Sequence, residues 1–394
     1  MPELPEVEHL RRSLEPHLVG ARVMAVRVWR RDIVRVAGTR KAVRGVKPAM
    51  LLQGDRIAHL IRRGKSMAIV GEAGGVLGVH LGMTGMMRIL GTSQADSPQR
   101  TQRARSERNG AGDEERDRHV HCEWTLVRER DPGRRSSALA PQRPWTRLGS
   151  EDDAPTRLGS SHLHLVRDVG GSTLITDGVI APIGQPFALW FRDPRRFGGL
   201  YPFASIDELH AHAGGWARLG PDALEIDPGI LRERLRRTTQ PIKAALLNQA
   251  LIAGVGNIYA DESLFASGIH PKSPPKRIGD EQWTRLAESI VRILRSAIDA
   301  GGSSISDYLD AQGEPGKYGG EHRVYGRGGQ PCALCSQPLC TCVVGQRTTV
   351  FCERCQPRRR KLAARRGVRA SPGSCPQRIT AMSGKRSAAR AAVV

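Results

Sequence analysis

The sequence contains no apolar run near the ~20 residues that a membrane-spanning helix needs, and no apolar stretch of the secretory-signal type near its start. It is also short of acidic residues, with 39 Asp and Glu against 61 Lys and Arg, so its net charge is +22. The first two absences predict a soluble cytoplasmic protein with no membrane partner. The shortage of negative charge predicts a polyanionic partner, nucleic acid above all.

Half of the excess positive charge lies at the C-terminus. Residues 358–394 hold eleven Lys and Arg and no acidic residue, so the rest of the chain keeps the other eleven of the 22 charges. This tail has few large apolar side chains, and we therefore expect it to be disordered unless it is bound. Two interpretations remain open: the tail adds non-specific affinity for DNA, or it is a solvated appendage.

Disulfides are not expected, because paired cysteines in a cytoplasmic protein indicate a metal site. Two C-x2-C pairs, sixteen residues apart, are formed by Cys332, Cys335, Cys352 and Cys355. These four thiols predict one structural zinc ion, since four protein ligands leave no open position on the metal. Cys340 and Cys342 lie between the pairs, and buried free thiols are the alternative. The polar residues 345–349 predict a hairpin turn that presents Arg347 to a groove or a phosphate.

Hydrophobic patterning divides the chain into a strand-rich and a helix-rich part. After a first helix with an apolar face, β-rich segments punctuated by glycine predict an antiparallel sheet or sandwich, at residues 23–29, 57–61, 67–70, 76–81, 119–127, 172–180 and 187–191. From about residue 206 the periodicity is helical, at residues 231–235, 242–252, 257–267 and 282–300. Residues 92–160 are densely charged, with 13 Arg and 12 acidic residues, and predict a largely disordered surface insertion.

The N-terminal residues predict catalysis by a nucleophilic amine. Once Met1 is removed, Pro2 carries a free secondary amine, which no internal proline can offer. A free α-amine titrates near pH ~8, so much of it is nucleophilic at neutral pH. Glu3 stands next to it as a candidate acid or base, and the pair suits iminium chemistry at a sugar or carbonyl carbon. The alternative, compatible with the first, is that Pro2 and Pro5 simply begin the helix.

Other segments predict contacts with nucleic acid, although each could be ordinary packing. Two glycines in residues 254–260 would let the backbone approach a phosphate at the start of a helix. Residues 193–198 form a turn with Arg195, Arg196 and Phe197, and Phe is a suitable wedge for the hole that an extruded base leaves. Met83, on another glycine-flanked turn, could be a second wedge.

Together these segments resemble the formamidopyrimidine-DNA glycosylase family. The stretches PELPEVE, RRGK, HLGMTG, DPRRFG, PIKAALLNQ, GVGNIYADESLFASGIHP, YGRGGQPC and GQRTTVFCERCQ follow one another as in that family. They cover about residues 1–90 and 187–357. Leu4 favours this branch over the related endonuclease VIII branch, which typically begins PEGPE.

The resemblance implies an α+β fold in four parts. Residues 1–205 would form a catalytic antiparallel β-sandwich with an N-terminal helix, carrying the long insertion at about 92–186, which exceeds the family's usual length by about 70 residues. Residues 206–326 would form a helix-two-turn-helix DNA-binding domain, 327–357 a four-cysteine zinc-finger hairpin, and 358–394 the basic tail. Duplex DNA would lie in the cleft, bound by a monomer at the bacterial nucleoid.

The resemblance also implies a bifunctional glycosylase and abasic-site lyase of base-excision repair. It would excise oxidised purines, mainly 8-oxoguanine and formamidopyrimidines, and then cut the strand by β,δ-elimination. Pro2 would attack C1′ to form the iminium, and Glu3 would donate a proton. Lys65 would serve β-elimination and Arg347 δ-elimination. DNA contacts would come from Met83, His119, Arg195, Arg196, Phe197, Lys243 and Asn257, with His162 as an alternative to His119.

Overall fold

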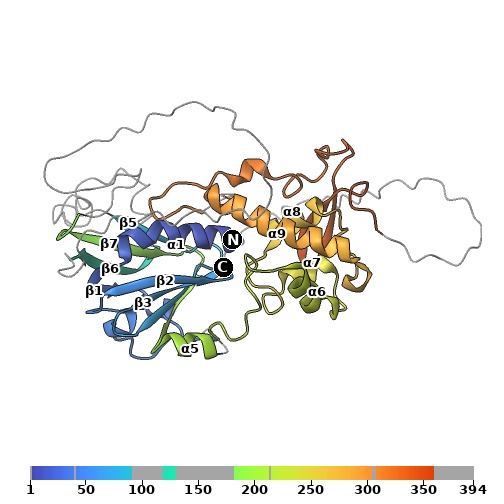
Figure 1. Cartoon of the computed structure of the whole chain (residues 1–394). Coiled ribbons are helices and arrows are strands. Elements are labelled where there is room, and N and C mark those ends of the chain that lie inside the picture. The colour runs from blue at the N-terminus through green and yellow to red at the C-terminus, as the bar shows by residue number, and fades with distance from the viewer. Residues whose placement is uncertain are drawn as a thin grey trace, which may run out of the picture.

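The computed structural model describes residues 2–39, 41–90, 119–129, 182–212, 214–303 and 308–358. Strand-rich and helix-rich parts lie at opposite sides of the molecule, with the first helix beside the strands (Figure 1). The strand expected at 172–180, most of the predicted insertion and nearly all of the basic tail lie outside the described residues. The four domain boundaries therefore stay predictions.

The strand-rich part is a sandwich of two antiparallel four-stranded sheets. One sheet has the order β1-β6-β7-β5, formed by β1 (Ala21–Val28), β6 (Val120–Arg128), β7 (Pro186–Arg192) and β5 (Met86–Leu90). The other has the order β2-β3-β4-β8, formed by β2 (Ile57–Arg63), β3 (Ser66–Gly71), β4 (Val76–His80) and β8 (Gly199–Phe203). Alternation along β4 sends Leu77 and Val79 into the sandwich core. The predicted antiparallel sandwich is thereby confirmed.

Helix α1 (Leu4–Leu18) joins the two parts of the molecule. Its residues Leu10, Leu14 and Leu18 are fully buried in the sandwich core, whereas Leu4 belongs to the core of the helical part. The helix begins with Glu3 at the N-cap and Pro5 in its first turn, which suits proline because the first amides need no intrahelical partner. The start of the chain is thus fixed where both cores meet.

The helical part is built from α6 (Pro228–Arg236), α7 (Ile242–Leu247), α8 (Asn257–Ala266) and α9 (Asp280–Asp299), while the short α5 (Ile206–Ala211) lies on the sandwich. The helix expected at 242–252 ends at Leu247. Beyond it, Gly254 has a φ of +114° and its amide donates to Gln249 Oε1 at 2.9 Å, so a turn replaces the helix. No helix among the described residues is long and apolar enough to span a membrane.

The last element is the expected hairpin. Strands β9 (Cys340–Val344) and β10 (Arg347–Phe351) pair antiparallel around a two-residue turn. Both turn residues, Gly345 and Gln346, have positive φ angles of +56° and +60°, which matches the twist that a two-residue hairpin requires. The Val350 amide donates to Asp261 Oδ2 at 3.1 Å, so the hairpin is attached to α8.

Candidate active site and nucleic-acid interface

Pro2 and Glu3 are buried at the junction of the two parts. The Glu3 side chain is 4% exposed, and its Oε1 accepts a hydrogen bond of 3.2 Å from the amide of Ile258 at the start of α8. A side chain at Gly256 would collide with the Glu3 carboxylate, which explains the glycine at this place. Glu3 Oε2 has no hydrogen-bond partner within the part of the chain that the structure describes. One carboxylate oxygen is therefore available to another molecule.

Burial sets the protonation of Glu3. It raises the pKa of this carboxyl above its ordinary value, the nearby positive charge of Lys65 partly opposes the rise, and Glu6 adds to it. A buried carboxyl with a raised pKa holds its proton at a higher pH than an exposed one. Such a group can donate a proton near neutrality, which is what an acid catalyst needs.

Lys65 and Arg347 approach the same region from distant parts of the sequence. Lys65 stands in the turn between β2 and β3, and burial lowers the pKa of its ammonium group. The charges of Glu3 and Glu6 oppose this shift, whereas Arg347 adds to it, so these three groups lie within electrostatic reach of Lys65. Arg347 itself is exposed on the hairpin. The structure thus brings together the predicted catalytic side chains.

Glu6 is a residue of this site that the sequence analysis does not predict. Its Oε2 accepts from the Glu3 amide at 2.7 Å. Its Oε1 accepts from the Tyr259 hydroxyl at 2.6 Å and the Ser303 amide at 2.7 Å. The spacing of Glu3 and Glu6, a capping box at the start of α1, was the signal that could have found it. Glu6 holds Glu3 and thereby positions the N-terminus.

A buried ion pair fixes the turn that carries Lys65. Arg62 donates to both Asp222 oxygens, at 2.6 and 3.1 Å, and to Glu8 Oε2 at 3.0 Å. Asp222 Oδ2 also accepts from the Gly64 amide at 2.8 Å. The side chains of Arg62 and Asp222 are only 8% and 9% exposed. Strands β2 and β3 thus meet in a hairpin turn whose Arg62 is buried and paired.

We expect Asp222→Asn to destabilise the fold by about 3–5 kcal/mol, because it leaves the buried Arg62 with one charged partner fewer. The control is Asp280→Asn, which breaks the exposed pair of Arg232 and Asp280 and should change stability by about 1 kcal/mol or less. Denaturant unfolding of both variants measures the difference. Equal effects would contradict a structural role for the buried pair.

The two predicted wedge loops are joined through Asp193. This buried carboxylate accepts from Thr84 Oγ1 at 2.6 Å and from the Gly198 amide at 2.7 Å, while the Arg195 amide donates to Thr84 Oγ1 at 3.1 Å. Phe197 is 51% exposed, and the Arg195 guanidinium lies 5.3 Å from its ring centre. Met83 directly precedes Thr84, the residue that is hydrogen-bonded to this loop. An exposed aromatic ring on a rigid loop is suited to insertion between bases.

Of the two histidines proposed to bind DNA, His119 and His162, the structure describes only His119. The His119 carbonyl accepts from the Asp193 amide at 3.1 Å, which puts the start of β6 beside the wedge loops. The neighbouring His121 is buried, with Nε2 2.8 Å from the Asp193 carbonyl oxygen. His162 lies outside the described residues. The role of His119 in DNA binding stays a prediction.

The surroundings of Lys243 do not fit its predicted role as a phosphate clamp. Its side chain is completely buried, and Nζ lies 2.8 Å from Asp261 Oδ1, 2.8 Å from Thr349 Oγ1 and 3.1 Å from the Thr348 carbonyl oxygen. A phosphate cannot reach an ammonium group that is enclosed in this way. Lys243 therefore ties α7 to α8 and to β10, which positions the hairpin. Asn257, also predicted as a clamp, is half-buried and donates to the Thr348 carbonyl at 3.2 Å.

The four predicted metal ligands form a cluster. The Sγ atoms of Cys332, Cys335, Cys352 and Cys355 lie within 4.8 Å of one another, with 3.4 Å between Cys335 and Cys352 and 3.9 Å between Cys332 and Cys355. A tetrahedral zinc site with Zn–S bonds of ~2.3 Å separates its sulfurs by about 3.8 Å. These thiols fit such an ion. Cys340 and Cys342 are outside the cluster, on β9.

Models of known protein domains match two parts of the chain. The formamidopyrimidine-DNA glycosylase N-terminal domain matches residues 1–136, and the formamidopyrimidine-DNA glycosylase H2TH domain matches residues 219–308. Curated formamidopyrimidine-DNA glycosylases from Solibacter usitatus and Gloeobacter violaceus are each 33% identical to this chain. The matches cover 91% of this chain and all of the first relative, and 90% of this chain and 98% of the second.

Solved structures of Fpg proteins are also similar to this chain. The MutM (Fpg) protein of Thermus thermophilus is similar with a TM-score of 0.61 and 29% identity, over 91% of this chain and all of that one. Wild-type Fpg of Lactococcus lactis, in complex with DNA that contains an N7-benzyl-Fapy-dG, gives a TM-score of 0.63 and 27% identity over the same shares. The expected enzyme class, a bifunctional DNA glycosylase and abasic-site lyase of base-excision repair, is thereby confirmed. Its full-length relatives, its two matching domains and its fold together establish that the chain belongs to the formamidopyrimidine-DNA glycosylase family.

Proposed function

We propose that this enzyme removes oxidised purines, mainly 8-oxoguanine and formamidopyrimidines, from duplex DNA through an iminium at Pro2, and then nicks the strand by β,δ-elimination. The observation that carries the proposal is the buried Glu3 beside Pro2, with a raised pKa and one oxygen that has no partner among the described residues. The similar Lactococcus lactis protein has been solved with DNA containing a Fapy-dG analogue and with DNA containing an abasic site. Both are the kinds of DNA that such a reaction would bind or produce.

In the first half of the reaction, the bond from C1′ to the base is replaced by a bond from C1′ to the enzyme. The free Pro2 amine forms a bond to C1′ while the bond from C1′ to the base breaks, and the base leaves with a proton. Glu3 then gives its proton to the ring oxygen O4′, and the sugar opens to an iminium on Pro2. The Glu3 oxygen without a partner is the atom that would hold this proton. Deep burial keeps water away from the covalent intermediate.

The second half breaks the strand twice. The iminium acidifies the C2′ proton; when this proton is removed, its electrons form a double bond and the 3′ phosphate leaves. A second elimination releases the 5′ phosphate, and hydrolysis of the iminium frees Pro2. Lys65, with a pKa lowered by burial, suits proton transfer in the first elimination. Arg347 is permanently charged and exposed, and would stabilise the phosphate that leaves in the second.

The remaining residues would hold the duplex open. Phe197, with Arg195 stacked on it, would fill the gap left by the extruded nucleotide, and Arg195 would face the orphaned cytosine. Met83 would insert beside them, while Arg196, Asn257 and His119 would contact the backbone. The basic body would make affinity dependent on salt. We expect a monomer to do this at the nucleoid.

Borohydride trapping tests the proposed function. The enzyme without Met1 is incubated with an 8-oxoguanine:cytosine duplex, reduced, digested and mapped by mass spectrometry. A crosslink at Pro2 is the expected result, because reduction converts the iminium to a stable amine. Duplexes with a formamidopyrimidine and with an undamaged guanine complete the comparison. A crosslink at a lysine, or equal trapping on undamaged DNA, would overturn the assignment.

One structural zinc ion would hold the hairpin that presents Arg347. We expect Cys352→Ser to lose the zinc, to weaken binding of lesion-containing duplex and to reduce the slope of log affinity against log salt by about 1, as for one lost phosphate contact. Cys342→Ser, a change in the same hairpin outside the cluster, is the control and should keep both properties. Metal analysis and a salt titration measure them. Unchanged zinc content in Cys352→Ser would refute the four-cysteine site.

A further inference from the structure

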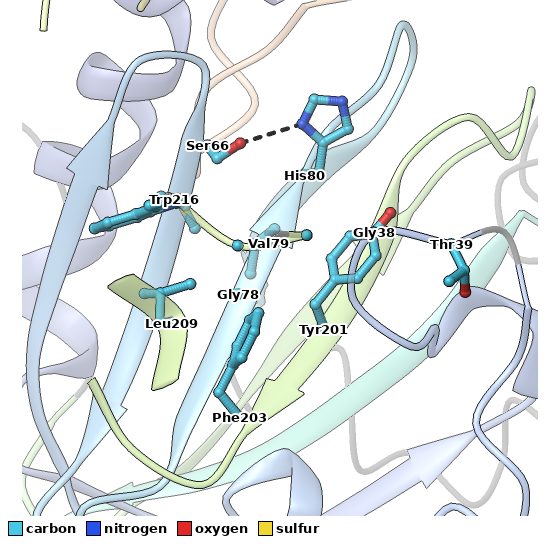
Figure 2. A pocket seen from close by; sticks show the side chains of 13 residues that line it. Gly38, Thr39, Ser66, Gly78, Val79, His80, Tyr201, Phe203, Leu209 and Trp216 are labelled. Carbon is cyan, nitrogen blue, oxygen red and sulfur yellow. Dashed lines mark hydrogen bonds between the residues drawn. The ribbon is translucent and has the colours of Figure 1, made fainter. Parts of the chain in front are cut away.

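A cavity of about 360 Å³ lies on the outer face of the sheet β2-β3-β4-β8, away from the sandwich core (Figure 2). Its other walls are α5 and two loops, residues 38–39 and 214–216, which touch one another: a side chain at Gly214 would collide with Gly38. The volume is within the usual range of small-molecule sites, about 300–1,000 Å³. None of the steps proposed above uses this space.

The walls of the cavity are aromatic. Tyr201 and Phe203 come from β8 and face Trp216 and Leu209 across the floor at Gly78 (Figure 2). Two rings are fixed by edge-to-face contacts from outside, Phe203 by His212 at 6.1 Å and Trp216 by His210 at 5.2 Å. Rigid aromatic walls bind flat heterocycles by stacking, and they accept any nucleobase because every base has a flat face.

Gly78 lets the aromatic side chains of β8 pack close to β4. A Cβ at Gly78 would lie 3.1 Å from Phe203 Cε2 and 3.3 Å from the Tyr201 carbonyl oxygen, so a larger side chain would press against Phe203 and narrow the cavity. Glycine inside a strand weakens the strand, and it often marks a place where a ligand approaches the backbone. Gly78 therefore determines how close Phe203 lies to the floor of the cavity.

One end of the cavity is polar. Ser66 and His80 form it, with Ser66 Oγ 3.4 Å from His80 Nδ1 (Figure 2). Burial lowers the pKa of His80, the positive charges of Lys65 and Arg35 lower it further, and the negative charge of Asp193 opposes them, so two cations and one carboxylate act on this end. Arg35 is held there by hydrogen bonds to the Arg196 and Asp32 carbonyls, at 3.0 and 3.2 Å. Two cations beside a serine hydroxyl favour a phosphate.

We propose that this cavity is a second nucleotide-binding subsite, in which a nucleobase stacks on the aromatic walls and its terminal phosphate lies against Arg35 and Ser66. Two sources have this chemistry: a free nucleoside monophosphate, or the phosphorylated terminal nucleotide of a nicked strand. Because Ser66 directly follows Lys65, the occupant would sit next to the group assigned to strand cleavage. The subsite goes beyond the proposed function and does not depend on it.

Calorimetry with dGMP on the full chain tests the subsite. We expect saturable binding that Gly78→Val weakens at least tenfold, because the new side chain fills the floor. Gly75→Val, directly before the same strand and outside the cavity, is the control and should bind dGMP like the parent. Arg35→Gln should weaken dGMP binding but leave guanosine binding unchanged, since guanosine has no phosphate. Tyr201→Leu removes one ring without filling the cavity, and serves if Gly78→Val does not fold.

Competition separates the two sources. A nicked duplex with terminal phosphates that displaces dGMP from the parent indicates the strand end, and failure to displace it indicates the free nucleotide. Absence of dGMP binding, or equal binding by the parent, Gly78→Val and Tyr201→Leu, would overturn the subsite. Trapping at Pro2 is measured separately, so failure of the subsite and failure of the proposed glycosylase reaction are distinguishable.

Discussion

A chain with one extra residue before Pro2 should bind lesion-containing duplex and yet form no trapped complex and no nick. The extra residue converts the Pro2 nitrogen from a secondary amine to a tertiary amide, which carries no proton and is not nucleophilic. Every covalent step depends on that nitrogen, so cleavage should fall to background rather than by a modest factor. A cleavable N-terminal tag allows the comparison within one preparation, because removal of the tag down to Pro2 should restore full activity.

Retained binding is the essential part of this experiment. Pro2 is buried, so an added residue could also disturb its surroundings. Affinity for the duplex depends mainly on phosphate contacts made elsewhere, and it should therefore change little. A tagged chain that cleaves as well as the processed one would remove Pro2 from the mechanism. Loss of binding and cleavage together would indicate a disturbed fold, which the thermal midpoint of the tagged chain reveals.

The sequence was sufficient where a function depends on a short segment. The free amine at Pro2, the C-x2-C pairs and the exposed Phe197 each carry their chemistry in a few neighbouring residues. The structure gathers the four cysteines into one cluster and places Arg195 over the Phe197 ring. Strand positions were also predictable, because β3 and β4 are short β-rich runs bounded by glycine, although both of their faces are buried.

Contacts between distant segments were not predictable in this way. Glu6 accepts from Tyr259 and Ser303, which are about 250 and 300 positions away in the chain, and nothing around Glu6 indicates them. Lys243 was assigned to a phosphate through the family resemblance alone; its contacts with Asp261 and Thr349 depend on how α7, α8 and β10 pack. The helix expected to run on to residue 252 ends at Leu247 instead, because the Asn248 backbone is extended and its side-chain oxygen accepts from the Ala250 amide.

The second large effect is expected for Glu3→Gln, which removes the proton that Glu3 would donate during base excision. An amide cannot donate the proton that opens the sugar, so base excision should fall by about 10²–10⁴, the usual contribution of an acid catalyst. Nicking of a preformed abasic site should fall far less, because its sugar already opens to an aldehyde that can condense with Pro2 without this proton. Glu15→Gln, an exposed change on the same helix, is the control and should leave both activities intact.

The pH dependence distinguishes an acid from a carboxylate that merely shapes the pocket. A group with a raised pKa is protonated below that pKa and loses its proton as pH rises through it. Excision by the parent should therefore rise with pH as the Pro2 amine loses its proton, and fall again as Glu3 does, giving a bell. The residual activity of Glu3→Gln should keep the rise and lack the fall. A fall that persists in Glu3→Gln would assign the acid to another group, with Lys65 the first to examine, because burial lowers its pKa.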